Sequence, residues 1–459
     1  MPHAIVIGLG KSGTAAARLL NHQGWQVTAS DQGNSEVLQQ TKQTLEEQGM
    51  TVQLGQPLAL NAELARSVTR LVVSPGVPWD SPTLVYARAL GIEVMGEMEL
   101  AWQTLQDIPW IGVTGTNGKT TVTSLLSAIF RSAGCWAPAC GNIGYAACEV
   151  ALEVLTTKRS PDWIIAEVSS YQIEASPTLA PHIGLWTTFT PDHLSRHKTL
   201  ERYYGIKARL LQRSQQAILN GDDANLYQRA ADWPKAHWTQ TDVSLSQADA
   251  IADPIAPTAT ITGGWVWVEG CKILPADALR MRGDHNQQNL LLAVAAAHLA
   301  GLKPEAIASG VETFPGVPHR LEQIICWRGI DFINDSKATN YDAAEVGLRS
   351  VSAPVVLIAG GEPKVGDDGP WMAQIQAKAA FVLLIGAAAT PFAQRLDEVG
   401  YRNYKQASTL DIAVQLAAEL AQAHQAKAVL LSPACASFDQ YRSFEHRGEH
   451  FRQLCQNLP

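Results

Sequence analysis

The chain has 459 residues, of which 46% are hydrophobic, enough for roughly three globular domains of ordinary size. Its 35 basic and 43 acidic residues give a formal net charge of −8, so bulk electrostatics do not favour nucleic-acid binding. The chain starts without a basic leader or cleavage site, and no apolar run approaches the roughly 18 residues that span a bilayer. These features predict a cytoplasmic protein with no membrane or nucleic-acid partner.

The seven cysteines are an odd number in a long chain without a signal peptide, which predicts reduced thiols instead of a disulfide framework. Cys135 and Cys140 are the only close pair. No second pair of Cys or His follows at the spacing of a zinc site, so we interpret the two cysteines as small buried hydrophobic residues.

The first block of the chain follows the pattern of a nucleotide-binding βαβ unit. An apolar strand at residues 4–7 leads into a G-x-G-x-x-G turn that begins at Gly8, an alanine-rich helix and a second strand at residues 26–30. Asp31 ends that strand 23 residues after Gly8, where a dinucleotide-binding unit carries an acidic residue. Alone, this unit would ordinarily indicate NAD and an oxidoreductase.

The second block begins with a phosphate-binding pattern. A short apolar strand at residues 109–113 runs into Gly115-Thr116-Asn117-Gly118-Lys119-Thr120-Thr121, which opens a helix. Backbone N–H groups of such a loop point at an anion, Lys119 can reach the terminal phosphates, and the Thr120 hydroxyl can ligate Mg²⁺. A strict P-loop has glycine where this chain has Val113. The alternative is a tight strand-to-helix turn with an incidental lysine.

Polar residues follow two further strands of this block. Glu167 comes directly after an apolar strand at residues 163–166, where its carboxylate can reach a Mg²⁺ ion carried by a nucleotide. Asp192 and His193 follow a strand at residues 183–188. A capping or solvated acid is the alternative for Glu167, and an ordinary surface or core histidine is the alternative for His193.

The remainder of the chain is also α/β. An alternating hairpin is predicted at residues 258–268, turning at Gly263-Gly264, whereas residues 228–257 show no recognisable chemistry. The third block contains nearly continuous apolar runs, which are typical of parallel strands covered on both faces, at residues 354–358, 381–385 and 428–431. Ligand sites are expected where such strands end.

Polar and charged residues at a strand end indicate a binding loop in the third block. The polar segment from Asp335 to Asn340 follows a strand at residues 330–333, where a binding loop is more common than a plain turn. His319, Arg320 and Lys364 add side chains that can meet anionic groups.

The order of these motifs along the whole chain resembles the Mur ligases of peptidoglycan synthesis. The segments that carry the resemblance are the phosphate loop, Gly141-Asn142-Ile143-Gly144, Glu167-Val168-Ser169-Ser170-Tyr171-Gln172, Asp192-His193, Gly283-Asp284-His285-Asn286, Pro318-His319-Arg320 and Asn334-Asp335-Ser336-Lys337-Ala338-Thr339-Asn340. Within the family, the ending from Leu431 to Tyr441 resembles the members that add D-glutamate. The members that add L-alanine have His in place of Asn117, and folylpolyglutamate synthase, a relative, lacks the first domain.

The resemblance implies three α/β domains. Residues 1–97 would form a Rossmann-like domain for the UDP-linked substrate, residues 98–316 a central P-loop domain for ATP, and residues 317–459 a Rossmann-like domain with parallel strands for the amino acid. The implied protein is a cytoplasmic monomer that acts on small molecules.

The implied reaction forms an amide bond. ATP phosphorylates the terminal carboxylate of UDP-N-acetylmuramoyl-L-alanine, and the amine of D-glutamate attacks the acyl phosphate and displaces phosphate. Because a carboxylate must approach a triphosphate, metal ions and cationic side chains have to screen the charges.

Each site residue follows from the same resemblance. Lys119, His193 and Lys207 would be catalytic; Thr120 and Glu167 would hold one Mg²⁺, and His193 with a carbamylated Lys207 a second. Without the resemblance, Lys207 is an ordinary exposed amine on a probable helix. The remaining implied contacts are Gly115 to Thr121, Asn286, Arg320, Asp335 and Lys337 for ATP, Lys11, Ser12, Asp31, Gly76 and Asn142 for the UDP substrate, and Lys364, Ser437 and Phe444 for D-glutamate.

Two other classes of protein compete with this interpretation. An NAD-dependent oxidoreductase would explain the first block but neither the phosphate loop nor Glu167. A non-catalytic nucleotide-binding protein or regulatory ATPase would explain the phosphate loop, and would hydrolyse ATP without any need for an amino acid.

Overall fold

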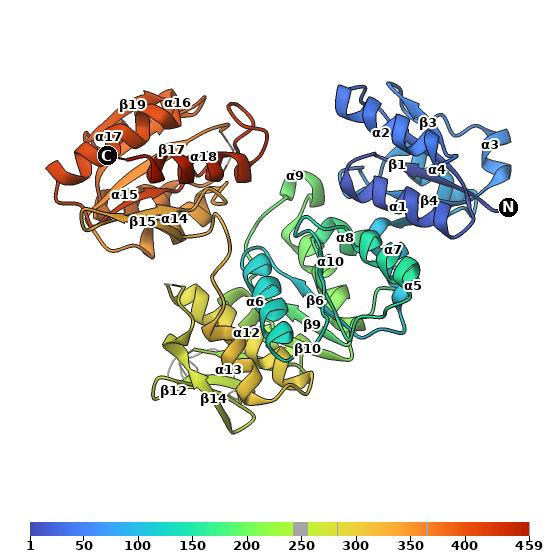
Figure 1. Cartoon of the computed structure of the whole chain (residues 1–459), viewed down its shortest axis with the longest axis horizontal. Helices are drawn as coiled ribbons and strands as arrows, with labels where there is room; N and C mark the ends of the chain where they lie inside the picture. Colours follow the sequence, from blue (N-terminus) through green and yellow to red (C-terminus); the bar gives the residue numbers. More distant parts are fainter. Residues whose placement is uncertain (242–255, 282, 364–365, 459) are drawn as a thin grey trace. The chain divides into compact units, whose positions relative to one another are not determined.

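The computed structural model describes residues 1–241, 256–281, 283–363 and 366–458 (Figure 1). It contains three β-sheets in two compact units. One unit is formed by Met1–Leu279 with Gln287–Phe314, and the other by Arg280–Asn286 with Pro315–Pro459. The three α/β domains expected from the sequence are confirmed, whereas their boundaries at residues 97 and 316 stay predictions.

The first sheet is five-stranded and parallel, in the order β3-β2-β1-β4-β5. Alternate residues of β1 enter two cores, Ala4 and Val6 on one face and Ile5 on the other, so the middle of this strand is apolar on both faces. Its strands and helices are β1 (His3–Ile7), α1 (Lys11–His22), β2 (Gln26–Asp31), α2 (Glu36–Glu47), β3 (Thr51–Leu54), α3 (Ala62–Ser67), β4 (Val68–Val73), α4 (Pro82–Ala89), β5 (Glu93–Gly96) and α5 (Glu97–Leu105).

The second sheet has nine strands, in the order β14-β13-β12-β11-β10-β9-β6-β8-β7. Neighbouring strands from β7 to β12 are parallel, and the predicted hairpin is confirmed as the antiparallel pair β12 and β13. The strands are β6 (Trp110–Thr114), β7 (Ala139–Gly141), β8 (Ile164–Glu167), β9 (Ile183–Trp186), β10 (Gln216–Asn220), β11 (His237–Gln240), β12 (Ala259–Thr262), β13 (Trp265–Val268) and β14 (Cys271–Pro275).

Eight helices of the described chain accompany this sheet: α6 (Lys119–Ser132), α7 (Ala147–Thr157), α8 (Ser170–Glu174), α9 (Leu194–His197), α10 (Leu200–Arg213), α11 (Ala224–Tyr227), α12 (Asp284–Leu299) and α13 (Pro304–Glu312). α6 and α13 pack closely because α13 has a glycine at the contact: a Cβ on Gly310 would lie 2.5 Å from the Ile129 backbone. Part of the segment 228–257, where the sequence shows no chemistry, lies outside the described residues.

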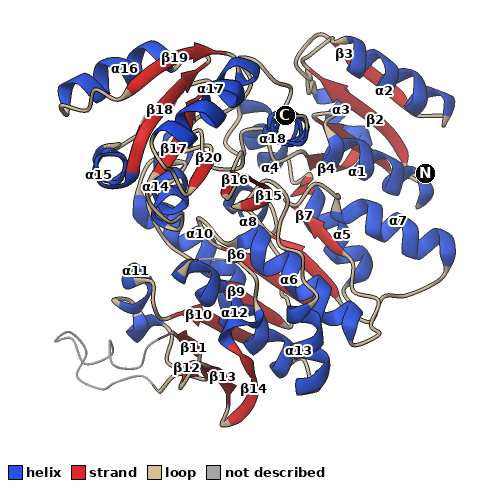
Figure 2. Cartoon of the chain, turned by 60° about the vertical axis from the view of Figure 1, so that its left-hand side comes forward, coloured by secondary structure: helices blue, strands red, loops and turns tan. Residues whose placement is uncertain are grey.

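The third sheet has six strands, in the order β15-β16-β20-β17-β18-β19, and only β15 runs antiparallel to its neighbour. Residues of β17 alternate between a core with α14 to α16 and a core with α17 and α18, so helices cover both faces (Figure 2). The elements are β15 (Glu322–Trp327), β16 (Ile330–Asn334), α14 (Tyr341–Arg349), β17 (Val355–Gly360), α15 (Gly369–Lys378), β18 (Ala379–Ile385), α16 (Ala389–Glu398), β19 (Tyr404–Ser408), α17 (Leu410–Ala423), β20 (Ala428–Leu431) and α18 (Phe444–Gln456).

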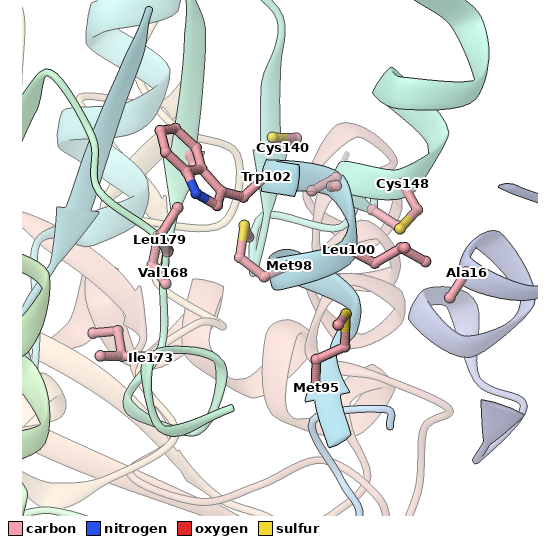
Figure 3. Close-up of a cluster of buried hydrophobic side chains, with 14 of the residues drawn as sticks. Ala16, Met95, Met98, Leu100, Trp102, Cys140, Cys148, Val168, Ile173 and Leu179 are labelled. Atoms are coloured by element: carbon pink, nitrogen blue, oxygen red, sulfur yellow. The ribbon is translucent and has the colours of Figure 1, made fainter. Parts of the chain in front are cut away.

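A continuous hydrophobic core joins the first two sheets through α5. Met98 and Trp102 of α5 lie in one cluster with Cys140 and with Cys148 of α7 (Figure 3). The carboxylate of Glu97 is also buried here, and its Oε1 accepts a 2.6 Å hydrogen bond from the Cys148 N–H. These contacts place the first two sheets in one compact unit.

All seven cysteines are free thiols. Cys140 is buried, as expected from the sequence, whereas Cys135 is half-buried. Within the described residues, no helix combines the length and apolar character needed to cross a membrane.

Candidate active site

The phosphate loop joins β6 to α6 in a shape that only glycine permits. Gly118, the residue before α6, has φ 84°, and a Cβ there would lie 2.5 Å from Asn289 Oδ1. Gly115 has φ 150°, and its Cβ would lie 1.9 Å from Thr187 Oγ1. Thr188, just after β9, holds the loop, because its carbonyl accepts from the Thr116 N–H at 2.8 Å. The backbone conformation of the loop is therefore set by its neighbours.

Two lysines of the predicted site meet at this loop. Lys119 Nζ donates to the carbonyls of Gly115 and Thr116 at 2.9 and 2.8 Å, and Lys207 Nζ donates to the same Gly115 carbonyl at 2.8 Å. Lys207 lies on α10 and is 1% exposed, so it is not the exposed amine that the sequence left as an alternative. Burial, reinforced by the charge of Lys119, lowers the pKa of Lys207 well below its ordinary value.

Glu167 is the last residue of β8. The sequence pattern instead predicted it just after the strand. Its side chain is buried: Oε1 accepts from Asn142 Nδ2 at 2.8 Å, whereas Oε2 has no hydrogen-bond partner among the described residues. A buried carboxylate oxygen without a donor is costly, and a cation would satisfy it. β8 pairs with β6, which leads to Thr120 at the start of α6, so Glu167 and Thr120 fit the donor set of a magnesium nucleotide.

His193 lies at the start of α9 with φ 54°, a conformation that few residues other than glycine adopt. Its Nδ1 is 3.1 Å from Tyr171 Oη, and its Nε2 is 3.4 Å from Asp192 Oδ2. The charges of Asp192 and Glu167 both raise the pKa of Lys207, against the larger effect of burial. Two carboxylates therefore lie within electrostatic reach of the Lys207 amine, one of them adjacent in sequence to His193.

A separate cavity of about 490 Å³ lies at the carboxyl edge of the first sheet, within the size range of small-molecule sites. Four of the residues expected to bind the UDP substrate line it: Lys11, Ser12, Asp31 and Gly76. The fifth, Asn142, lies elsewhere, beside Glu167. Both oxygens of Asp31 accept backbone hydrogen bonds, from Leu9 at 2.6 Å and from Gly33 at 2.8 Å.

In the second unit, the loop after β16 carries a buried acid. Asp335 is 4% exposed, and its Oδ2 accepts from Ser432 Oγ at 2.8 Å. Burial raises the pKa of Asp335 to about 7, although the nearby charge of Arg320 opposes this shift. Asn286, also expected at the nucleotide, is buried at the start of α12.

The residues expected to contact D-glutamate include neighbours of this loop. Lys337 Nζ lies 5.4 Å from the centre of the Phe444 ring, so one expected nucleotide contact adjoins one expected amino-acid contact. Ser437 is buried in the segment after β20. Lys364 lies outside the described residues.

Two polar residues, one at the phosphate loop and one at the loop after β16, were not predicted from the sequence. Asn289, which faces Gly118, lies one helical turn after Asn286, and that spacing on one helix was a usable signal. Arg447 is 1% exposed and donates hydrogen bonds to Ser336 and to the carbonyls of Cys435 and Ala436. No periodicity or motif distinguishes Arg447 in the sequence.

Comparison with known proteins gives the family. Residues 113–297 match the Mur ligase middle domain, and residues 2–96 match the MurD-like N-terminal domain of Mur ligases. Two curated proteins named UDP-N-acetylmuramoylalanine–D-glutamate ligase, from Microcystis aeruginosa and Synechocystis sp., are each 58% identical over 459 residues, covering 100% of this chain and 100% of their own. The chain belongs to the Mur ligase family.

Two solved structures share the fold of this Mur ligase. MurF from Acinetobacter baumannii aligns with a TM-score of 0.61 at 17% identity, covering 98% of this chain and 93% of its own. A pseudomurein peptide ligase type C from Methanothermus fervidus aligns with a TM-score of 0.60 at 17% identity, covering 100% of both chains. At this identity, the likeness shows the fold alone.

Proposed function

We propose that this Mur ligase joins D-glutamate to UDP-N-acetylmuramoyl-L-alanine, with conversion of ATP to ADP and phosphate, in peptidoglycan precursor synthesis. The choice of substrates is supported by relatives that carry this activity in their names and match at 58% identity over the full length. The use of a magnesium nucleotide is supported by one structural observation, the buried and unpartnered Oε2 of Glu167 on the strand beside the phosphate loop.

The phosphate loop supplies the ATP site. Backbone N–H groups of residues 115–121 and the positive end of α6 receive the phosphates, and Lys119 neutralises the β and γ groups. Thr120 and Glu167 hold Mg²⁺. This ion, when bound, screens the charge that develops as the acceptor carboxylate attacks the triphosphate. The γ-phosphoryl group passes to that carboxylate, and the D-glutamate amine then displaces phosphate from the acyl phosphate.

A second Mg²⁺ is assigned to His193 and a carbamylated Lys207. The lowered pKa of Lys207 supports this assignment, because a neutral amine is the form that adds to carbon dioxide. The addition forms one C–N bond, releases one proton and turns the amine into an anionic carbamate. The carbamate would carry a negative charge, which suits a ligand of a cation, whereas the protonated Lys207 amine would carry a positive charge.

The remaining contacts follow the arrangement of the sites. The UDP portion of the acceptor occupies the cavity lined by Lys11, Ser12, Asp31 and Gly76, and Asn142 binds the acceptor nearer to Glu167. We further assign Asn286, Arg320, Asp335 and Lys337 to ATP, and Lys364, Ser437 and Phe444 to D-glutamate. We propose that the enzyme works as a monomer in the cytoplasm, without membrane or nucleic-acid partners.

An ADP-release assay with UDP-N-acetylmuramoyl-L-alanine tests the proposal. We expect ADP release only when D-glutamate is present, and none with L-glutamate, D-alanine or meso-diaminopimelate. ATP hydrolysis without any amino acid would instead favour a regulatory ATPase, and quenching of NADH fluorescence on binding would favour an oxidoreductase.

A further inference from the structure

Two side chains lie close to the ring nitrogens of His193. The histidine side chain is about half exposed. Tyr171 Oη lies 3.1 Å from Nδ1, and the carboxylate of Asp192 lies 3.4 Å from Nε2. The two ring nitrogens therefore have different neighbours, a neutral hydroxyl on one side and an anion on the other.

Tyr171 is itself firmly placed. It lies on α8, whose start is fixed by a capping box: the Ser169 hydroxyl accepts from the Gln172 N–H, and the Gln172 side chain accepts from the Ser169 N–H. The guanidinium of Arg196 lies 5.1 Å from the centre of the Tyr171 ring, and Arg196 is anchored by an ion pair with Glu174. The tyrosine hydroxyl is thus a fixed point only four residues after Glu167.

A buried histidine packs against the same tyrosine. His197 is fully buried, and its ring centre lies 5.3 Å from that of Tyr171 and 5.3 Å from that of Tyr203. Its Nε2 is 2.9 Å from Ser170 Oγ. Burial lowers the pKa of His197 to about 4, so the ring is neutral near pH 7 and packs as an aromatic spacer between the two tyrosines.

We propose that Tyr171 is a positioning residue that orients His193 toward a divalent cation, and that His197 holds Tyr171 in place. The inference rests on the proposed function, from which it takes the assignment of His193 to a cation. When Nε2 faces the cation, Nδ1 carries the ring hydrogen and donates it to Tyr171 Oη, which selects one tautomer and one ring orientation. Loss of such a partner typically weakens metal binding by about 10-fold or more.

Binding of Mn²⁺ to the full-length protein with a non-hydrolysable ATP analogue tests this without turnover. A titration followed by the electron paramagnetic resonance signal of free Mn²⁺ gives the number of bound ions and their affinities, and the change is expected at one of the two proposed cation sites. We expect Tyr171→Phe to weaken Mn²⁺ binding about 10-fold. The matched control is Tyr204→Phe, which loses a hydroxyl bonded to Asp232 at 3.0 Å and should bind Mn²⁺ like the wild type. Wild-type affinity in Tyr171→Phe, or equal losses in both variants, would overturn the proposal.

A second pair of variants tests the role of His197. His197→Phe keeps a ring between Tyr171 and Tyr203 and should retain Mn²⁺ affinity, whereas His197→Ala leaves a gap and should lose several-fold. Equal affinities in these two variants would contradict the spacer role. The ADP-release assay separates the two proposals: if the wild type never responds to D-glutamate while Tyr171→Phe still weakens Mn²⁺ binding, the proposed function fails and the positioning role stands.

Discussion

The phosphate loop of the first unit and the loop after β16 in the second unit are built by different means. The phosphate loop takes its shape from glycines whose missing side chains make room for Thr187 and Asn289. The loop after β16 takes its shape from buried charge, with Asp335 bonded to Ser432 and the guanidinium of Arg447 bonded to Ser336.

The difference predicts what each loop tolerates. A backbone shaped by close contacts is ready for its ligand before binding but cannot accept one added methyl group. A loop held by buried ionisable groups can accept small changes of shape, yet its stability changes with pH, because a buried acid must ionise or keep its proton. A substitution that adds bulk should therefore have its larger effect on the phosphate loop. A substitution that removes an ionisable group should have its larger effect on the loop after β16.

The largest effect is expected for Gly115→Ala. Its Cβ would lie 1.9 Å from Thr187 Oγ1, at a φ of 150° that side chains disfavour, so the loop must move out of its phosphate-binding shape. We expect a loss of ADP release of about 1,000-fold, or roughly 4 kcal/mol in the activation free energy. The measurement is the rate of ADP release together with the affinity for an ATP analogue.

Gly205→Ala is the matched control for that substitution. Gly205 lies on α10, and nothing lies within 4 Å of the Cβ that would be added. Removing a glycine from a helix should stabilise the protein by up to about 1 kcal/mol and leave activity unchanged. Substantial activity in Gly115→Ala would show that the glycines do not determine the phosphate loop.

The second prediction concerns Asp335→Asn and pH. Burial raises the pKa of Asp335 from 3.8 to about 7, so between these values the folded protein keeps a proton that the unfolded chain has released. The free energy of unfolding of the wild type should therefore fall as pH rises from 4 to 7, by roughly 3 kcal/mol relative to Asp335→Asn. Urea unfolding of both proteins across this range measures the difference. Burial also raises the pKa of Glu97 to about 7, but both proteins contain Glu97, so its contribution to the pH dependence cancels.

Ser432→Ala sharpens the same test. The Ser432 hydroxyl donates to Asp335 and lowers the pKa of that carboxyl, so its removal should extend the fall in stability to higher pH. A wild-type stability that stays parallel to that of Asp335→Asn from pH 4 to 8 would mean that buried charge does not control this loop.

The sequence predicted the phosphate loop and the main strands because both are local patterns. Gly115 to Thr121 and the apolar runs of β17, β18 and β20 can be recognised without knowing what packs against them. The roles assigned to the site residues stay predictions, carried by the family resemblance.

Features that depend on distant neighbours were not predicted. The burial of Lys207 arises because α10 packs beside β6, and Arg447 is buried by segments that meet only in the folded chain. Several strands were also missed, among them β7, β10, β11, β14, β15 and β19. None of the six residues of β15 is fully buried, so its hydrophobic pattern is weak.

The smallest effect is expected where charges meet at a surface. Arg18 of α1 and Glu149 of α7 join the first two sheets through a 2.8 Å ion pair, with 39% and 26% of their side chains exposed. Because water and salt screen this pair, a double-mutant cycle with Arg18→Met and Glu149→Gln should give a coupling of about 0.5 kcal/mol, and less in 1 M salt. A coupling above about 2 kcal/mol that persists in 1 M salt would contradict this expectation. It would show that an exposed ion pair contributes strongly to the stability of the first unit, so that a contrast between steric contacts and charge would no longer distinguish the two units.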